Sequence, residues 1–351
     1  MSEKLSYEFP QFYMPLHERG LNPAWGGSGA PMYDWAREFS LTADPAVMRQ
    51  MERTQPDFAT AICLTKAGPE RFEALCKYVL WVWAVDDGLD ERVSARDTVF
   101  VTEAVAELTR AIEGAGEVRS PVARAGRQVH ALVCAGRSAQ WCEEFTAEVM
   151  MWLATFVREV AAVRLGHVMA MEEYLPHRRY TSVLGWFMHL SEYAVGVDLP
   201  HQVRMLPAMV EVRYRGAEWI GIYNDVFSVD REDAVGYPFN SVLIVQRERR
   251  CSRQEAVEIV NTMLTGLMKQ FMAAVEQVPV QLSLISTDEN LHTQVAQVLE
   301  SYTTQVRGNF DYHRDRPRYV ESAAYLPGEQ QRGIRPAYST DERFHREVVR
   351  P

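Results

Sequence analysis

Three aspartates near residue 90 have the types and spacing of metal ligands. Asp86, Asp87 and Asp90 lie at the end of a run of helical periodicity that begins at Pro69. The apolar residues of this run recur every three or four positions and predict one buried helix face: Phe72, Leu75, Cys76, Val79 and Trp83. The same spacing continues to Asp86 and Asp90, whereas Asp87 lies about 100° off that face. Buried unpaired carboxylates are costly, so we expect a hard cation such as Mg²⁺ to neutralise them. The alternative is an acidic helix end in water.

A second polar set recurs at helical spacing further along the chain. Asn224, Ser228 and Glu232 are separated by steps of four, which places them on one face of a helix. Gly216 and Gly221 lie upstream, where each costs the helix about 1 kcal/mol relative to alanine and so indicates that space is needed. An amide, a hydroxyl and a carboxylate form an oxygen-only ligand set, which suits Mg²⁺ and not zinc. The alternative is a solvated polar face.

Both sets require long helices to hold them, and the periodicity predicts helices almost throughout. Long helical stretches are expected at 141–170, 171–198, 207–233, 252–278 and 291–315. Strand-like alternation is nearly absent, and no internal repeat or linker is evident. We therefore predict one all-α domain over residues 46–320, a helical bundle with a deep central cavity. An irregular Pro- and Gly-rich arm, 1–45, is expected before it, and a polar tail, 321–351, after it.

Composition excludes several functional classes. The chain has 351 residues, of which 47% are hydrophobic, and this allows a large core and excludes disorder as the main state. The net charge of −10 argues against nucleic-acid binding. The longest apolar run, 79–85, is too short to span a bilayer, and no secretory signal is visible at the start. Scattered cysteines without a CxxC pair indicate reduced thiols, so we expect a soluble cytoplasmic protein, with a homodimer as the default assembly.

The two polar sets together resemble the metal motifs of bacterial class I terpene synthases. The chain reads DDGLDE from position 86 and NDVFSVDRE from position 224. The segment YLPHRRYTSVLG resembles the diphosphate sensor of this family, and the spacing to the second motif favours Arg178 over the arginine beside it. The segment GNFDYHRDRPRY resembles the closing segment, with Arg318 and Tyr319 as its final Arg-Tyr pair. Tyr312 stands where the family often has tryptophan.

The resemblance implies where metal ions and substrate bind. In this family, the aspartate-rich motif and the Asn/Ser/Glu triad hold three Mg²⁺ ions around a prenyl diphosphate. The implied metal ligands in this chain are Asp86, Asp87, Asp90, Asn224, Ser228 and Glu232. The implied diphosphate donors are Arg178, Arg231, Arg318 and Tyr319. Thr181 as linker and Ser182 as effector would pass the movement of the sensor to the substrate, and a backbone carbonyl at a helix break near residues 182–185 would face the cation.

The implied reaction ionises an allylic diphosphate and cyclises the resulting carbocation. A cation needs an apolar aromatic wall, and Trp83, one turn before Asp86, is expected to supply one. Trp186, Phe187 and Phe58 fit ordinary core packing as well. We expect farnesyl diphosphate as substrate and a cyclic sesquiterpene hydrocarbon or alcohol as product. Geranylgeranyl diphosphate is the first alternative substrate and a C10 diphosphate the second. A prenyltransferase of the same fold, or a non-catalytic helical binding protein, is the alternative in function.

Overall fold

The described part of the chain is built from α-helices. The computed structural model describes residues 6–27, 29–41, 48, 51–52, 54–182 and 184–315, and no strand occurs among them. The helices discussed below are α1 (Ala30–Glu38), α3 (Pro56–Cys63), α4 (Pro69–Ser94), α5 (Thr98–Ile112), α6 (Pro121–Cys134), α7 (Ala139–Leu165), α8 (Met171–Thr181), α9 (Leu184–Val195), α10 (His201–Arg204), α11 (Pro207–Val235), α12 (Ser241–Arg249), α13 (Arg253–Ile285) and α14 (Glu289–Asp315). The prediction of an all-α fold is confirmed.

Local sequence signals explain where several helices begin and end. The side chains of Ser120, Ser138, Ser252 and Asn240 accept backbone N–H bonds and so cap the N-termini of α6, α7, α13 and α12. Helix α11 ends at Gly236, whose φ of 73° is a left-handed conformation that glycine adopts without steric cost. Of these signals, the glycine at the end of α11 belongs to a helix that carries one of the polar sets.

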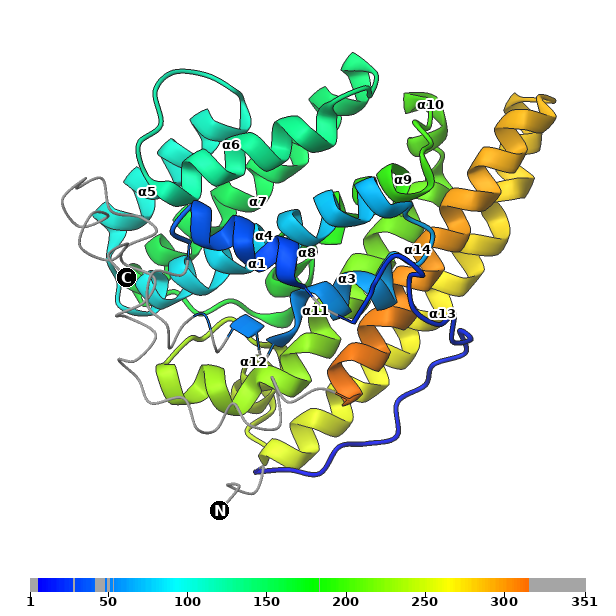
Figure 1. The fold of residues 1–351 in the computed structure, drawn as a ribbon. Helices are drawn as coiled ribbons and strands as arrows, with labels where there is room; N and C mark the ends of the chain where they lie inside the picture. Colours follow the sequence, from blue (N-terminus) through cyan, green and yellow to red (C-terminus); the bar gives the residue numbers. More distant parts are fainter. Residues whose placement is uncertain are drawn as a thin grey trace.

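The helices pack as a bundle around α11. Helix α11 packs against α13, α14, α8 and α9, whereas α4 packs against α3, α6 and α7. In Figure 1, α13 and α14 run along one flank of the bundle, and α5, α6 and α7 lie on the other side. The two helices that carry the predicted polar sets, α4 and α11, share α9 as a packing partner but otherwise pack mainly against different helices, and both line one cavity.

The segment expected to be an irregular arm contains a helix. Helix α1 begins with Pro31 in its first turn, packs against α4 and buries Met32, Tyr33, Trp35 and Ala36. The prediction of irregular structure is therefore wrong for residues 30–38. A nine-residue helix preceded by glycines gives little periodic signal, and its burial against α4 is a long-range effect that local sequence does not encode.

Two further features bear on the sequence predictions. The predicted stretch 171–198 is divided into α8 and α9, with Ser182 following α8 at the position where a helix break was expected. The predicted polar tail, 321–351, lies outside the described residues. Within the described ranges, none of the helices combines the length and apolar character that crossing a membrane requires.

Candidate active site

One cavity brings the two polar sets together. Asp86 and Asp90 of α4 line it along with Asn224, Arg231 and Glu232 of α11. The cavity-facing aspartates are the two that helical phase placed on the buried face of α4. The three- and four-residue spacing that buries the apolar residues of α4 therefore also turns Asp86 and Asp90 toward the cavity.

Two members of the predicted ligand set are placed differently from the rest. Asp87 does not line the cavity, and one of its carboxylate oxygens lies 3.9 Å from an Nη atom of Arg231. Ser228 is buried and does not line it either, and its hydroxyl donates to the backbone oxygen of Asn224 at 3.0 Å. A hydroxyl that donates one hydrogen bond keeps its acceptor lone pairs.

Acidic side chains are concentrated at the end of the cavity that Asp86, Asp90 and Glu232 line, which is called the acidic end below. Burial raises the pKa of Asp90 well above its usual range, and the nearby carboxylates of Asp86, Glu159 and Glu232 raise it further. Arg231 acts in the opposite direction and only partly offsets them. Clustered carboxylates that raise one another's pKa are the environment in which a bound cation is most strongly favoured.

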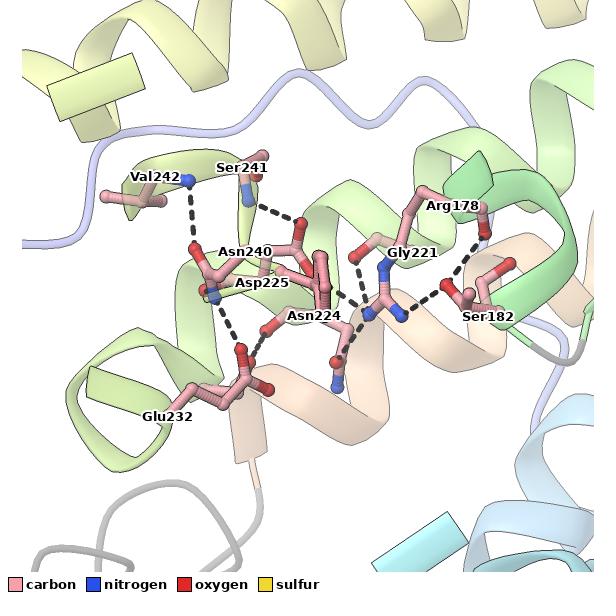
Figure 2. A network of polar contacts seen from close by, with 12 residues as sticks. Arg178, Ser182, Gly221, Asn224, Asp225, Glu232, Asn240, Ser241 and Val242 are labelled. Carbon is pink, nitrogen blue, oxygen red and sulfur yellow. Dashed lines mark hydrogen bonds and ion pairs between the residues drawn. The ribbon is translucent and has the colours of Figure 1, made fainter. Parts of the chain in front are cut away.

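The predicted diphosphate sensor, Arg178, is held by several acceptors beside the second polar set. Its guanidinium donates to Asn224 Oδ1 at 3.0 Å, to the backbone oxygen of Gly221 at 3.2 Å and to Thr181 Oγ1 at 3.1 Å, as Figure 2 shows in part. An Nη atom also lies 2.9 Å from Asp225 Oδ1. Arg178, Thr181 and Gly221 all line the cavity.

Ser182, the predicted effector, adjoins Arg178 through the backbone. The N–H of Ser182 donates to the backbone oxygen of Arg178 at 2.9 Å, and its hydroxyl donates to the backbone oxygen of Ala217 at 3.2 Å. Ser182 lines the cavity at the point where α8 ends. A displacement of Arg178 would therefore be passed to Ser182, and so to this part of the cavity wall, through the peptide chain and through this hydrogen bond.

Sequence reasoning missed Asp225, although it directly follows Asn224. Its carboxylate is 1% exposed and accepts from the Tyr174 hydroxyl and from the Ser241 N–H, each at 2.9 Å. Burial raises the pKa of Asp225, and Arg178 opposes this effect. The signal available in the sequence was an acidic residue about 100° from Asn224 on the same helix, which alone does not indicate burial.

Glu159 was also missed. This residue of α7 lines the cavity, and its carboxylate accepts from the Tyr237 hydroxyl and from His177 Nε2, each at 2.8 Å. It is one of four glutamates in α7, and nothing in its spacing set it apart from the others. His313 of α14 was missed as well, and its Nε2 accepts from the side-chain amide of Asn224 at 3.1 Å while its Nδ1–H donates to the backbone oxygen of Asn309 at 2.7 Å.

Apolar and aromatic side chains line the rest of the cavity. Trp83 lines it with Phe156, Phe187 and Tyr312, and the ring centroids of Trp83 and Tyr312 are 6.0 Å apart. Trp186 is instead packed among core aromatic rings, which agrees with its core-packing interpretation. Phe58 is buried but does not line this cavity. The predicted Arg318 and Tyr319 lie outside the described residues.

Comparisons with known proteins agree with the fold and the cavity. The family model described as terpene synthase family 2, C-terminal metal binding, matches residues 77–270. A (2Z,6E)-hedycaryol synthase of Kitasatospora setae is 27% identical over 315 residues, which cover 90% of this chain and 93% of that protein. A 7-epi-alpha-eudesmol synthase of Streptomyces viridochromogenes, named as cyclising (2E,6E)-farnesyl diphosphate, is 28% identical over 58% of this chain and 60% of its own length.

The solved structure of apo hedycaryol synthase superimposes with a TM-score of 0.78 and 26% identity, over 88% of this chain and all of that one. The matched family segment contains both polar sets, Arg178 and most of the cavity wall. It also spans more than half of the sequence. The chain therefore belongs to terpene synthase family 2 and is a class I terpene synthase.

Proposed function

We propose that this chain is a sesquiterpene cyclase that acts on farnesyl diphosphate with Mg²⁺ and releases diphosphate. The observation that carries the proposal is the single cavity, which is acidic and arginine-bearing at one end and lined by Trp83, Phe156 and Phe187 elsewhere. This division suits a substrate with a charged head and a hydrocarbon tail. The names of the similar synthases, one of which specifies farnesyl diphosphate, support the C15 substrate.

The donor set fits magnesium ions. Asp86 and Asp90 from α4, with Asn224, Ser228 and Glu232 from α11, would hold them, and Asp87 would act through Arg231 and other indirect contacts. In the described chain, no three acidic, histidine or cysteine side chains are grouped closely enough to hold a metal by themselves. We therefore propose that diphosphate oxygens complete the coordination, with three ions as the family resemblance implies. Bound Mg²⁺ would neutralise the charge that develops on the leaving diphosphate.

Arginines are proposed to bind the diphosphate directly. Arg178 and Arg231 line the cavity beside the acidic residues, and a guanidinium presents paired donors to phosphate oxygens. Arg318 and Tyr319 are proposed to close over the diphosphate, on the basis of the sequence motif alone. Movement of Arg178 would shift Ser182 through the hydrogen bond between their backbones.

The remaining wall protects the cation. Trp83 presents an aromatic ring next to the turn that carries Asp86, and an aromatic face stabilises a desolvated cation by about 2 kcal/mol. Phe156, Phe187 and Tyr312 extend the wall and exclude water from the reacting carbon atoms. Geranylgeranyl diphosphate is the first alternative substrate. The cytoplasmic location and the homodimer stay predictions.

Product analysis with defined substrates tests the proposal. The protein is incubated with geranyl, farnesyl or geranylgeranyl diphosphate, with Mg²⁺ or with excess chelator, and the volatile products are identified by gas chromatography and mass spectrometry. We expect cyclic C15 products from farnesyl diphosphate only when Mg²⁺ is present. A kcat/KM for geranylgeranyl diphosphate well above that for farnesyl diphosphate would reject the C15 assignment. Equal turnover in excess chelator would reject the metal-dependent mechanism.

A further inference from the structure

Asn240 joins the cavity to the start of α12. It lies between α11 and α12 and is fully buried. Its side-chain amide nitrogen donates to Glu232 Oε2 and to the backbone oxygen of Asp225, each at 2.8 Å. Its side-chain oxygen accepts from the backbone N–H groups of Val242 at 2.9 Å and Leu243 at 3.4 Å. Figure 2 shows the contacts of Asn240 with Glu232 and Val242 beside Arg178.

The two ends of the Asn240 amide cannot be exchanged. If the amide were turned over, its NH₂ group would face the N–H groups of Val242 and Leu243, and its oxygen would face the Glu232 carboxylate. Both arrangements are repulsive, because they oppose donor to donor and acceptor to acceptor. The helix cap therefore fixes the direction in which Asn240 donates to Glu232.

A neutral donor at this point has a specific consequence for Glu232. The amide engages one carboxylate oxygen, Oε2, and leaves the charge of the group intact. The other oxygen, Oε1, lies 3.6 Å from an Nη atom of Arg231, and a second cationic side chain in the place of Asn240 would compete further with a bound cation. Glu232 also lines the cavity, so a carboxylate that is oriented but still charged faces the acidic end.

The same helix start also anchors the diphosphate sensor. The N–H of Ser241, the first residue of α12, donates to Asp225 Oδ2 at 2.9 Å, and Asp225 Oδ1 lies 2.9 Å from Arg178. Asn240 additionally donates to the backbone of Asp225. The α11 segment from Asp225 to Glu232 is thus tied at both ends to the N-terminus of α12.

We propose that Asn240 is a positioning residue for the metal-dependent step, which orients Glu232 for Mg²⁺ and fixes its distance from Asp225. This role rests on the proposed function. Residues that hydrogen-bond to metal ligands commonly affect metal affinity by about 10- to 100-fold. We therefore expect loss of the Asn240 donor to weaken Mg²⁺ binding by about that factor, while the cap of α12 is kept.

Two substitutions separate the donor from the cap. Serine and aspartate both cap helices about as well as asparagine, so Asn240→Ser and Asn240→Asp keep the acceptor for α12. Asn240→Ser removes the NH₂ donor without adding charge. Asn240→Asp adds a carboxylate opposite Glu232 and should have the larger effect. Ser120→Ala is the matched control, because it removes the cap of α6, which lies outside the cavity.

The first measurement does not depend on turnover. Thermal unfolding is followed while Mg²⁺ is titrated at a fixed concentration of inorganic diphosphate, and the Mg²⁺ concentration at half of the maximal shift is compared between variants. We expect an increase of about 10-fold or more for Asn240→Ser and no change for Ser120→Ala. The Mg²⁺ concentration for half-maximal turnover of farnesyl diphosphate should rise in parallel, with a smaller change in kcat at saturating Mg²⁺.

Specific outcomes would overturn the proposal. A half-saturation of Asn240→Ser within about twofold of wild type, or an equal change in Ser120→Ala, would show that Asn240 acts only as a helix cap. If Asn240→Asp fails to fold, Asn240→Ser alone decides. Failure of the proposed function is recognised separately, because wild type itself would then give no Mg²⁺-dependent product from any prenyl diphosphate.

Discussion

Gly221 offers the sharpest test of whether the positions of Arg178 and Ser182 matter for turnover. A Cβ atom added at this residue of α11 would lie 2.9 Å from Ser182 Cβ and 3.0 Å from Arg178 Cγ. Ordinary carbon contacts are about 3.5–4.0 Å, so Gly221→Ala must push the two side chains away by about half an ångström or more. These are the side chains that the proposed mechanism requires to move in a controlled way.

The expected magnitudes separate stability from function. Alanine is favoured over glycine within a helix by about 1 kcal/mol, whereas overpacking costs about 1–3 kcal/mol. The net loss in the free energy of unfolding should therefore be about 0–2 kcal/mol, and the variant should fold. Misplacement of a positioned group by about 1 Å can cost about 100-fold in rate, so kcat/KM for farnesyl diphosphate should fall by that order.

Gly266 supplies a matched control for the same substitution. It lies inside α13, and a Cβ added there meets no atom within 4 Å. Gly266→Ala should raise the free energy of unfolding by up to about 1 kcal/mol and leave kcat/KM unchanged. Both variants are assayed by urea unfolding without ligands and by steady-state kinetics with Mg²⁺. A Gly221→Ala enzyme whose kcat/KM is within about threefold of wild type would refute the reasoning.

Three further predictions concern the acidic end and the wall. Asp86→Ala or Asn224→Ala should lose most turnover and keep the helical circular-dichroism spectrum, and retained activity in either would count against their role as ligands. Because the pKa of Asp90 is raised by burial and by neighbouring carboxylates, the native metal-free protein binds this proton more tightly than the unfolded chain does. The contribution of this carboxyl group to stability should therefore fall as pH rises above about 4, and Asp90→Asn should remove that part of the pH dependence in urea unfolding at several pH values. Trp83→Leu should preserve Mg²⁺ dependence but reduce kcat and change the product ratio in gas chromatography, and an unchanged product profile would exclude Trp83 from the cation-facing wall.

Helical spacing predicted cavity-lining residues correctly where those residues lie on one face of a single helix. The spacing along α4 distinguished Asp86 and Asp90 from Asp87, and the cavity is lined by the first two. Steps of four placed Asn224 and Glu232 on one face of α11, and both line the same cavity. In each case the inference needed only the geometry of a single helix. The roles of these residues in metal binding stay predictions.

Contacts between helices could not be predicted in this way. Glu159 reaches the cavity because α7 packs beside α4 and α8, and its partner Tyr237 comes from the segment after α11. Asp225 is buried because α12 presents the Ser241 N–H to it and α8 presents Tyr174. A single sequence shows which residues are acidic. It does not show which helices pack together, and that packing decides which acidic residues are buried.

The adjacent residues Asn224 and Asp225 suggest how diphosphate binding and metal binding are coupled. Arg178 donates to Asn224 Oδ1, the atom that a metal ion would require, and forms an ion pair with Asp225 Oδ1 at 2.9 Å. A dication and a guanidinium on one oxygen repel each other, so we expect Arg178 to leave Asn224 Oδ1 when it binds diphosphate. Mg²⁺ and inorganic diphosphate together should then raise the unfolding temperature by more than the sum of their separate effects, because only the native state binds both. Arg178→Gln should lose this synergy and, because the competing guanidinium is gone, should respond to Mg²⁺ alone at least as strongly as wild type. Additive shifts in wild type, or full synergy in Arg178→Gln, would contradict the coupling and leave Arg178 as a static structural partner of Asp225.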